Sequence, residues 1–124
     1  MKKLIALALF VVSVLSISAQ VNIYKPEADA EEDIANAVEV ASKSGKHIFL
    51  QIGGNWCPWC VKFHNFLEAN EELTSYVKAN YEVVKVNYDR KENQNEIWET
   101  LGFPQRFGFP VFVVLYQINF ILPH

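Results

Sequence analysis

The chain has 124 residues, of which 51% are hydrophobic, 14% aromatic and 20% charged. This length and composition fit one compact globular domain and exclude a disordered, collagen-like or coiled-coil chain. Eleven Lys and Arg residues stand against 14 Asp and Glu residues, for a formal net charge of −3. An acidic chain lacks the cationic surface that binds phosphate backbones, so nucleic acid is not an expected partner.

The start of the chain has the pattern of a secretory signal peptide. Two lysines precede an almost unbroken apolar run at residues 4–17, and Ser18 and Ala19 supply small residues for a signal peptidase. The run is shorter than the roughly 20 residues needed to span a bilayer. We therefore expect a signal peptide at 1–19 and one domain at 20–124, periplasmic or secreted, with no stable membrane span after signal removal. The alternative is an uncleaved membrane anchor.

The first two elements after an irregular lead-in are a helix and a strand. Residues 31–44 carry apolar side chains at helical spacing, with acids in the first turn and Gly45 after the last. These features are typical of an amphipathic helix. Residues 47–52 form a short apolar run, which indicates a strand buried on both faces.

A second helix and a second strand follow. Apolar residues recur with a period near 3.6 from Cys57 onward, so a helix is predicted to begin there. Residues 71–80 continue or restart this helix. Residues 81–87 alternate in polarity and contain three valines, which favours a strand.

The last predicted elements complete an alternating order. Residues 93–101 indicate a third helix that Gly102 ends, and after a loop at 103–109 the apolar run 110–116 indicates a third strand. Helices that alternate with strands predict an α/β fold with at least one parallel crossover.

Two cysteines lie at the junction between the first strand and the second helix, in the sequence Trp56-Cys57-Pro58-Trp59-Cys60. Pro58 fits the first helical position, where a missing N–H costs nothing, so Cys57 becomes the N-cap. A sulfur there faces the free N–H groups of the first turn and the positive end of the helix dipole. Both favour the thiolate and lower the thiol pKa, as in reactive cysteines. Cys60, one turn along, is placed to resolve a mixed disulfide.

This cysteine pair is better suited to chemistry than to stabilisation. Cys57 and Cys60 are the only cysteines of the chain. By loop entropy, a four-residue ring contributes only about 1.9 kcal/mol, against about 3 kcal/mol for a fifteen-residue loop. Redox chemistry is therefore the preferred interpretation of the motif.

The chain resembles the thioredoxin superfamily over roughly residues 31–116. The resemblance rests on the Trp-Cys-x-x-Cys sequence at 56–60 after a buried strand, and on Gly108-Phe109-Pro110 before an apolar strand. It implies a three-layer α/β/α fold with a central mixed sheet. It also implies that Pro110 follows a cis peptide bond and lies opposite the cysteine pair, where backbone near Phe109 pairs with an extended substrate segment.

The function implied is that of an exported thiol–disulfide oxidoreductase, in which Cys57 attacks a substrate disulfide and Cys60 resolves the mixed disulfide. Its partners are disulfide-containing proteins and a membrane electron donor, and no cofactor or metal is expected. A reductive direction is favoured over an oxidase or isomerase function, because no dimerisation segment is visible. The expected substrate-binding residues are Trp56, Pro58, Trp59, Phe109 and Pro110.

Three features depart from the family pattern. Many thioredoxins have a buried acid six residues before the first cysteine, where this chain has Gln51, which either orients a water or simply packs under the helix. Pro58 and Trp59 differ from the Gly-Pro of thioredoxin and are closer to the Pro-Tyr of glutaredoxins, so the direction of electron flow stays open. Only 14 residues follow Pro110. We expect either that the final strand and helix are missing or that a partner covers the exposed sheet.

A function from a different class is a metal-handling or non-catalytic binding module on the same fold. His64 shares a helical face with Cys57 and Cys60. Structural zinc takes four ligands, however, and no fourth candidate lies near in sequence. Four further aromatic residues are expected to be core, namely Phe63, Phe66, Trp98 and Phe112.

Overall fold

The computed structural model describes residues 21–91 and 95–116. The predicted signal peptide at 1–19 and the last eight residues, 117–124, lie outside the described part. The elements in chain order are α2 (Ala30–Ser44), β1 (His47–Gly53), α3 (Pro58–Ala69), α4 (Glu71–Asn80), β2 (Tyr81–Asn87), α5 (Asn95–Thr100), the 3₁₀ turn η1 (Pro104–Phe107) and β3 (Val111–Leu115).

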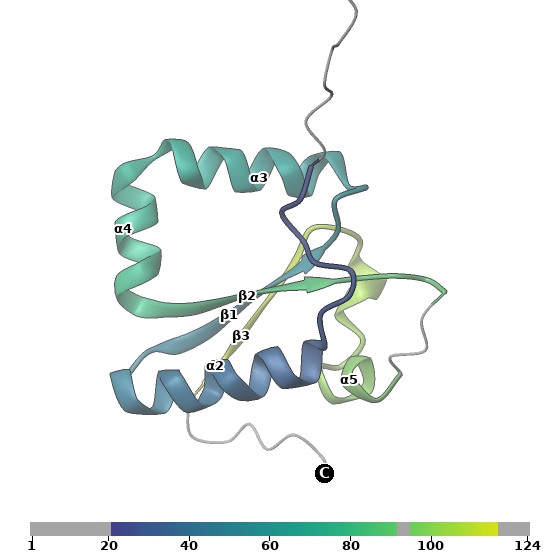
Figure 1. The fold of residues 1–124 in the computed structure, drawn as a ribbon, viewed down its shortest axis with the longest axis horizontal. Helices are drawn as coiled ribbons and strands as arrows, with labels where there is room; N and C mark the ends of the chain where they lie inside the picture. The colour runs from purple at the N-terminus through teal and green to yellow at the C-terminus, as the bar shows by residue number, and fades with distance from the viewer. Residues whose placement is uncertain (1–20, 92–94, 117–124) are drawn as a thin grey trace, which may run out of the picture.

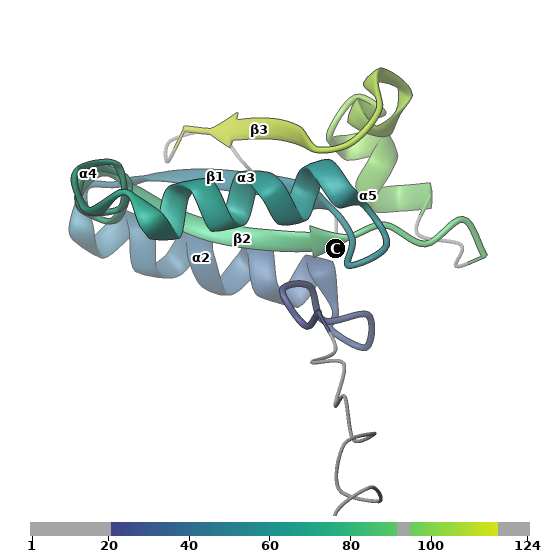
Figure 2. The same cartoon turned by 90° about the horizontal axis from the view of Figure 1, so that it is seen from above.

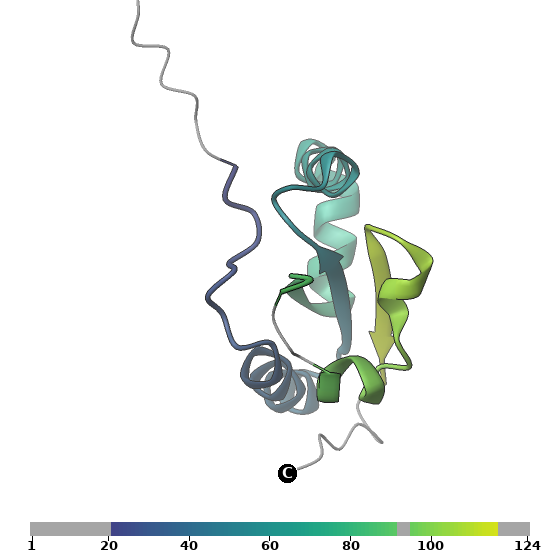
Figure 3. The same ribbon diagram turned by 90° about the vertical axis from the view of Figure 1, so that its right-hand side faces the viewer.

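The three described strands form one mixed sheet in the order β2-β1-β3 (Figure 2). β1 pairs in parallel with β2, with His47 opposite Tyr81. It pairs antiparallel with β3, with Ile52 opposite Val111. α2 lies on one side of this sheet and α3 on the other, and an end-on view shows the layers (Figures 1 and 3). The predicted α/β fold with a central mixed sheet is confirmed.

The main core lies between the sheet and α2. Alternation along β1 directs Ile48, Leu50 and Ile52 to this face, and all three are fully buried. They pack against Ile34 and Ala41 of α2, among other residues of one continuous cluster. Burial of an aliphatic side chain contributes about 1.5–3 kcal/mol, so this layer holds β1 in the middle of the sheet.

α2 is fixed at both ends by caps. The Asp29 side chain accepts hydrogen bonds from the backbone N–H groups of Glu31 and Glu32, at 2.9 and 3.1 Å. Gly45 adopts a left-handed conformation with φ 74°, and its N–H donates to the carbonyl oxygen of Ala41. Such caps satisfy backbone groups that have no partner within the helix. The predicted helix is confirmed and begins one residue earlier.

α3 and α4 are two separate helices on the other side of the sheet. Asn70 has extended backbone angles and ends α3. Its side chain accepts a hydrogen bond of 3.0 Å from the N–H of Leu73 and so caps α4. The helix predicted over residues 71–80 therefore restarts rather than continues.

The segment predicted as a loop before the last strand contains the single turn η1. Pro104 occupies its first position, and Phe103 precedes it with φ 56°, an unusual value for a residue with a side chain. Gly108 follows with φ 92°. The chain thereby reverses and enters β3 beside β1.

The prediction that all four large aromatics are core is wrong for two of them. Trp98 is buried in the main core, as predicted. Phe66 is 60% exposed and Phe112 is also exposed, while Phe63 is half-buried with its ring 4.6 Å from that of Phe112. Phe63 of α3 and Phe112 of β3 do meet on the α3 side of the sheet, but the described residues leave Phe66 and part of Phe112 exposed.

None of the described helices is long and apolar enough to cross a membrane.

Candidate redox site

The cysteine pair lies where β1 ends and α3 begins. Cys57 is the N-cap of α3, with extended backbone angles, and Pro58 opens the helix. The N–H of Cys57 donates to the carbonyl oxygen of Gly54, which closes the turn between strand and helix. The sequence-based prediction of Cys57 at the cap and Pro58 in the first turn agrees with this geometry.

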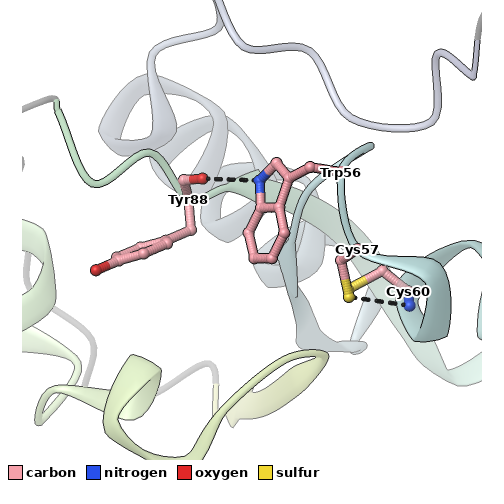
Figure 4. Close-up of a disulfide and its surroundings, with 4 residues drawn as sticks. All are labelled: Trp56, Cys57, Cys60 and Tyr88. Atoms are coloured by element: carbon pink, nitrogen blue, oxygen red, sulfur yellow. Dashed lines mark hydrogen bonds between the residues drawn. A yellow bond between two sulfur atoms is a disulfide. The ribbon is translucent and has the colours of Figure 1, made fainter.

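Cys57 and Cys60 form a disulfide, with their Cα atoms 5.2 Å apart. The backbone N–H of Cys60 donates to Sγ of Cys57 over 3.2 Å, as Figure 4 shows. Both side chains are buried. The sulfur of Cys57 thus takes the place that an oxygen has in an ordinary N-cap, where negative charge on it is favoured by the helix dipole.

Two tryptophans flank the pair at the surface. Trp59 is 67% exposed, and Nζ of Lys62 lies 4.4 Å from the centre of its ring. Trp56 is also exposed, and its Nε1 donates to the carbonyl oxygen of Tyr88 over 3.2 Å (Figure 4). This bond joins the loop before Cys57 to the residue that follows β2.

The Phe109–Pro110 peptide bond is cis, as predicted. Phe109 packs against the cluster that holds both cysteines, and its ring meets that of Trp56 edge-on at 5.2 Å. The structure therefore brings together the two sequence-predicted segments, the 56–60 motif and Phe109, although about fifty residues separate them.

Gln51 lies on the face of β1 turned toward α3 and is almost fully buried. Its Oε1 accepts a hydrogen bond of 2.9 Å from Nζ of Lys85 on β2. Burial lowers the pKa of Lys85, and Glu68 partly opposes this effect. Gln51 therefore has a charged partner, which neither sequence-based interpretation included.

Gln51 and Lys85 line a cleft of about 420 Å³ between α3, α4 and β2. His64 and Glu68 of α3 line it too. Burial lowers the pKa of His64, and the charge of Lys85 adds to the effect. In residues 21–91 and 95–116, no three His, Cys, Asp or Glu side chains gather closely enough to hold a metal ion.

Sequence reasoning missed Tyr24, Asn55 and Lys85. Lys85 could have been found, because it interrupts an apolar strand on the face that also carries Gln51. Tyr24 lies in the irregular lead-in, and nothing in its local sequence indicates that it packs against the two cysteines. Asn55 binds the backbone of that lead-in across 31 residues of chain.

Residues 29–116 match a family model described as thioredoxin-like. The chain therefore belongs to the thioredoxin-like family. It is similar to a solved structure, a disulphide isomerase from Xylella fastidiosa Temecula1, with a TM-score of 0.73 and 27% identity. This match covers 80% of the chain and 75% of the isomerase chain.

Two curated relatives match the chain over shorter stretches. A probable nucleoredoxin 3 of Oryza sativa subsp. japonica is 33% identical over 72 residues, which is 57% of this chain and 15% of that protein. A disulfide bond reductase DsbH of Chlamydia pneumoniae is 29% identical over 66 residues, 52% of this chain and 40% of that protein. The chain thus matches less than half of the length of either relative.

Proposed function

We propose that the protein is an exported thiol–disulfide oxidoreductase that reduces disulfide bonds in other proteins. The observation that supports this most is the position of Cys57, whose sulfur caps α3 and accepts a hydrogen bond from the N–H of Cys60. A thiolate at this position is stabilised both by the N–H group and by the helix dipole.

The reaction proceeds by two exchanges between sulfurs. In the reduced protein, the thiolate of Cys57 attacks one sulfur of a substrate disulfide, and the other substrate sulfur leaves with the electron pair. The thiolate of Cys60 then attacks Sγ of Cys57, which restores the Cys57–Cys60 disulfide and releases the substrate as a dithiol. A second dithiol must afterwards reduce the protein, and it supplies the two electrons.

The substrate segment lies on the surface beside the cysteine pair, where Trp56 and Trp59 are exposed. Trp59 offers an exposed apolar surface beside Pro58, and Trp56 meets Phe109 edge-on at the opposite side. The backbone before Pro110 pairs with an extended peptide as an added strand, in which main-chain hydrogen bonds provide affinity without a fixed sequence.

The relatives support disulfide exchange as the reaction, and the start of the chain supports export as the location. A relative named as a disulfide bond reductase and a structural neighbour named as a disulphide isomerase both support disulfide exchange in protein substrates. The basic and apolar pattern of residues 1–19 supports export to the periplasm or beyond, as one domain from residue 20 onward. A membrane protein is then the electron donor.

The test is the reduction of a peptide that carries one intramolecular disulfide, with dithiothreitol as electron source. We expect the wild-type protein to accelerate it and Cys57→Ser to abolish the acceleration. Reduced Cys60→Ser, incubated with the peptide after dithiothreitol has been removed, is expected to form a mixed disulfide with the peptide, visible by mass spectrometry, because no second thiol of the protein remains to release it. A wild-type protein that gives no acceleration contradicts the proposed function.

A further inference from the structure

The segment that precedes α2 is bound to the turn before the cysteine pair. Oδ1 of Asn55 accepts hydrogen bonds from the backbone N–H groups of Ile23 and Tyr24, at 2.9 and 2.8 Å. Nδ2 of Asn55 donates to the carbonyl oxygen of Tyr24 over 2.8 Å. The side chain of Asn55, two residues before Cys57, thus fixes the backbone of Ile23 and Tyr24 through three hydrogen bonds, two of them to Tyr24.

This attachment places the side chain of Tyr24 beside the buried sulfur. Tyr24 is only 2% exposed and shares a cluster with Cys57 and Cys60. A Cβ atom placed on Gly53 would collide with Sγ of Cys60 and would lie 3.2 Å from the Tyr24 hydroxyl oxygen. The hydroxyl and the sulfur therefore lie next to the same point of the backbone, where the glycine leaves room for both.

The sulfur of Cys60 needs a hydrogen-bond donor during the reaction. When a thiolate attacks Sγ of Cys57, the Cys57–Cys60 bond breaks and Cys60 leaves as a thiolate. Cys60 is only 1% exposed, and an apolar environment disfavours a thiolate. Its own N–H group is directed at Sγ of Cys57, so it does not serve this purpose.

We propose that the hydroxyl of Tyr24 donates a hydrogen bond to Sγ of Cys60 whenever that sulfur is a thiolate. This inference rests on the proposed function and adds Tyr24 to its catalytic residues. When the Cys57–Cys60 disulfide of the protein is reduced, the electron pair of the broken S–S bond passes to Cys60 and the phenolic proton stays on Tyr24. Solvent later supplies the proton that completes the Cys60 thiol. When the protein reduces a substrate, the same hydrogen bond from Tyr24 stabilises the Cys60 thiolate before it attacks Cys57.

The protonation of Tyr24 is consistent with this function. Burial raises the pKa of Tyr24 to about 12, so the hydroxyl keeps its proton at neutral pH and acts as a donor, not a base. A hydrogen bond to a charged group is stronger than one between neutral groups. Gly53 is required as well, because any side chain at that position would separate the hydroxyl from the sulfur.

The inference is tested with Tyr24→Phe, which retains the ring and removes the hydroxyl. In reduced protein labelled with ¹³C at the cysteine Cβ atoms, NMR titration gives the pKa of the Cys60 thiol. We expect Tyr24→Phe to raise it by about one unit or more. Tyr76→Phe, an exposed tyrosine of α4, is the matched control and should leave it unchanged. An unchanged pKa in Tyr24→Phe overturns the inference.

A second measurement needs no variant. In the reduced wild-type protein, the ¹³Cζ resonance of Tyr24 should shift with the same midpoint as the Cβ resonance of Cys60. Separate midpoints overturn the inference.

The two proposals can fail separately. Protein that reduces no peptide disulfide, but shows the Tyr24-dependent pKa, supports the hydrogen bond and contradicts the proposed function. Protein that reduces the peptide with a Cys60 pKa unaffected by Tyr24→Phe overturns only the present inference.

Discussion

Nζ of Lys85 donates a hydrogen bond of 2.9 Å to Oε1 of Gln51 beneath the helix that carries the cysteine pair. Gln51 is buried, so loss of this partner leaves its carbonyl oxygen without a hydrogen bond in the interior. A carboxamide at this position takes up no proton at neutral pH. The pair therefore supplies a fixed polar contact between β1 and β2 rather than a proton acceptor.

A double-mutant cycle tests this pairing. Lys85→Met should lower the free energy of unfolding by about 1–3 kcal/mol, because the Gln51 oxygen stays buried and unpaired. Gln51→Leu should cost less, since the half-buried ammonium of Lys85 can still reach water. The double variant should lose less than the sum of the single losses. Additive losses in urea unfolding contradict a direct pair.

Gly53→Ala should disturb the cysteine pair directly. The added methyl group would overlap Sγ of Cys60, which is almost fully buried, so the backbone or the disulfide must shift. We expect a loss of about 1–3 kcal/mol in the free energy of unfolding of the oxidised protein, as for other overpacked cores. Urea unfolding measures it, and a stability equal to that of the wild type contradicts the close contact between β1 and the disulfide.

Trp59→Ala should separate peptide binding from thiol chemistry. Trp59 is largely exposed, so its loss should change the free energy of unfolding by no more than about 0.5 kcal/mol. Reduction of a peptide disulfide by the variant should slow, while its direct exchange with dithiothreitol should keep its rate. Only the peptide is large enough to contact Trp59 while it reacts at Cys57.

The control for this variant is Tyr76→Ala, which removes an exposed aromatic side chain from α4. It should leave both rates at the wild-type level. Equal slowing of the peptide and dithiothreitol reactions by Trp59→Ala argues against a substrate contact.

The stability of the protein should depend on His64 near neutral pH. Burial lowers the pKa of His64 in the folded protein, and the charge of Lys85 acts in the same direction. Below the unfolded-state pKa of about 6.5, the unfolded chain binds a proton that the folded chain binds less readily, so stability falls as pH falls. His64→Gln should remove this part of the pH dependence between pH 7.5 and 5.5. If the free energy of unfolding depends on pH in the same way in the variant and the wild type, His64 is not the source of this dependence.

The order and type of the elements could be predicted from sequence because each has a local signal. The helix over 31–44 has its acids and its terminal glycine, and the strand over 81–87 has its alternation. The positions of Phe66 and Phe112 could not be predicted. Spacing assigns a side chain to one face of an element, but whether another segment covers that face depends on the whole fold.

The cysteine site likewise has features that could be predicted from the sequence and one that could not. Cys57 as the N-cap of α3 follows from Pro58 and the strand-to-helix junction, and the cis bond before Pro110 follows from the family resemblance. Tyr24 has no such signal, because Asn55 holds its backbone through two hydrogen bonds that each span 31 residues. Contacts of this kind become visible only when the chain has folded.

The pH dependence of Cys57 alkylation in the reduced protein tests the central claim most directly. The rate of reaction with iodoacetamide, followed by mass spectrometry at Cys57, gives the pKa of its thiol. A sulfur at the N-cap of α3 should have a pKa clearly below the unperturbed ~8.5. A pKa at or above that value would contradict an activated nucleophile at this position.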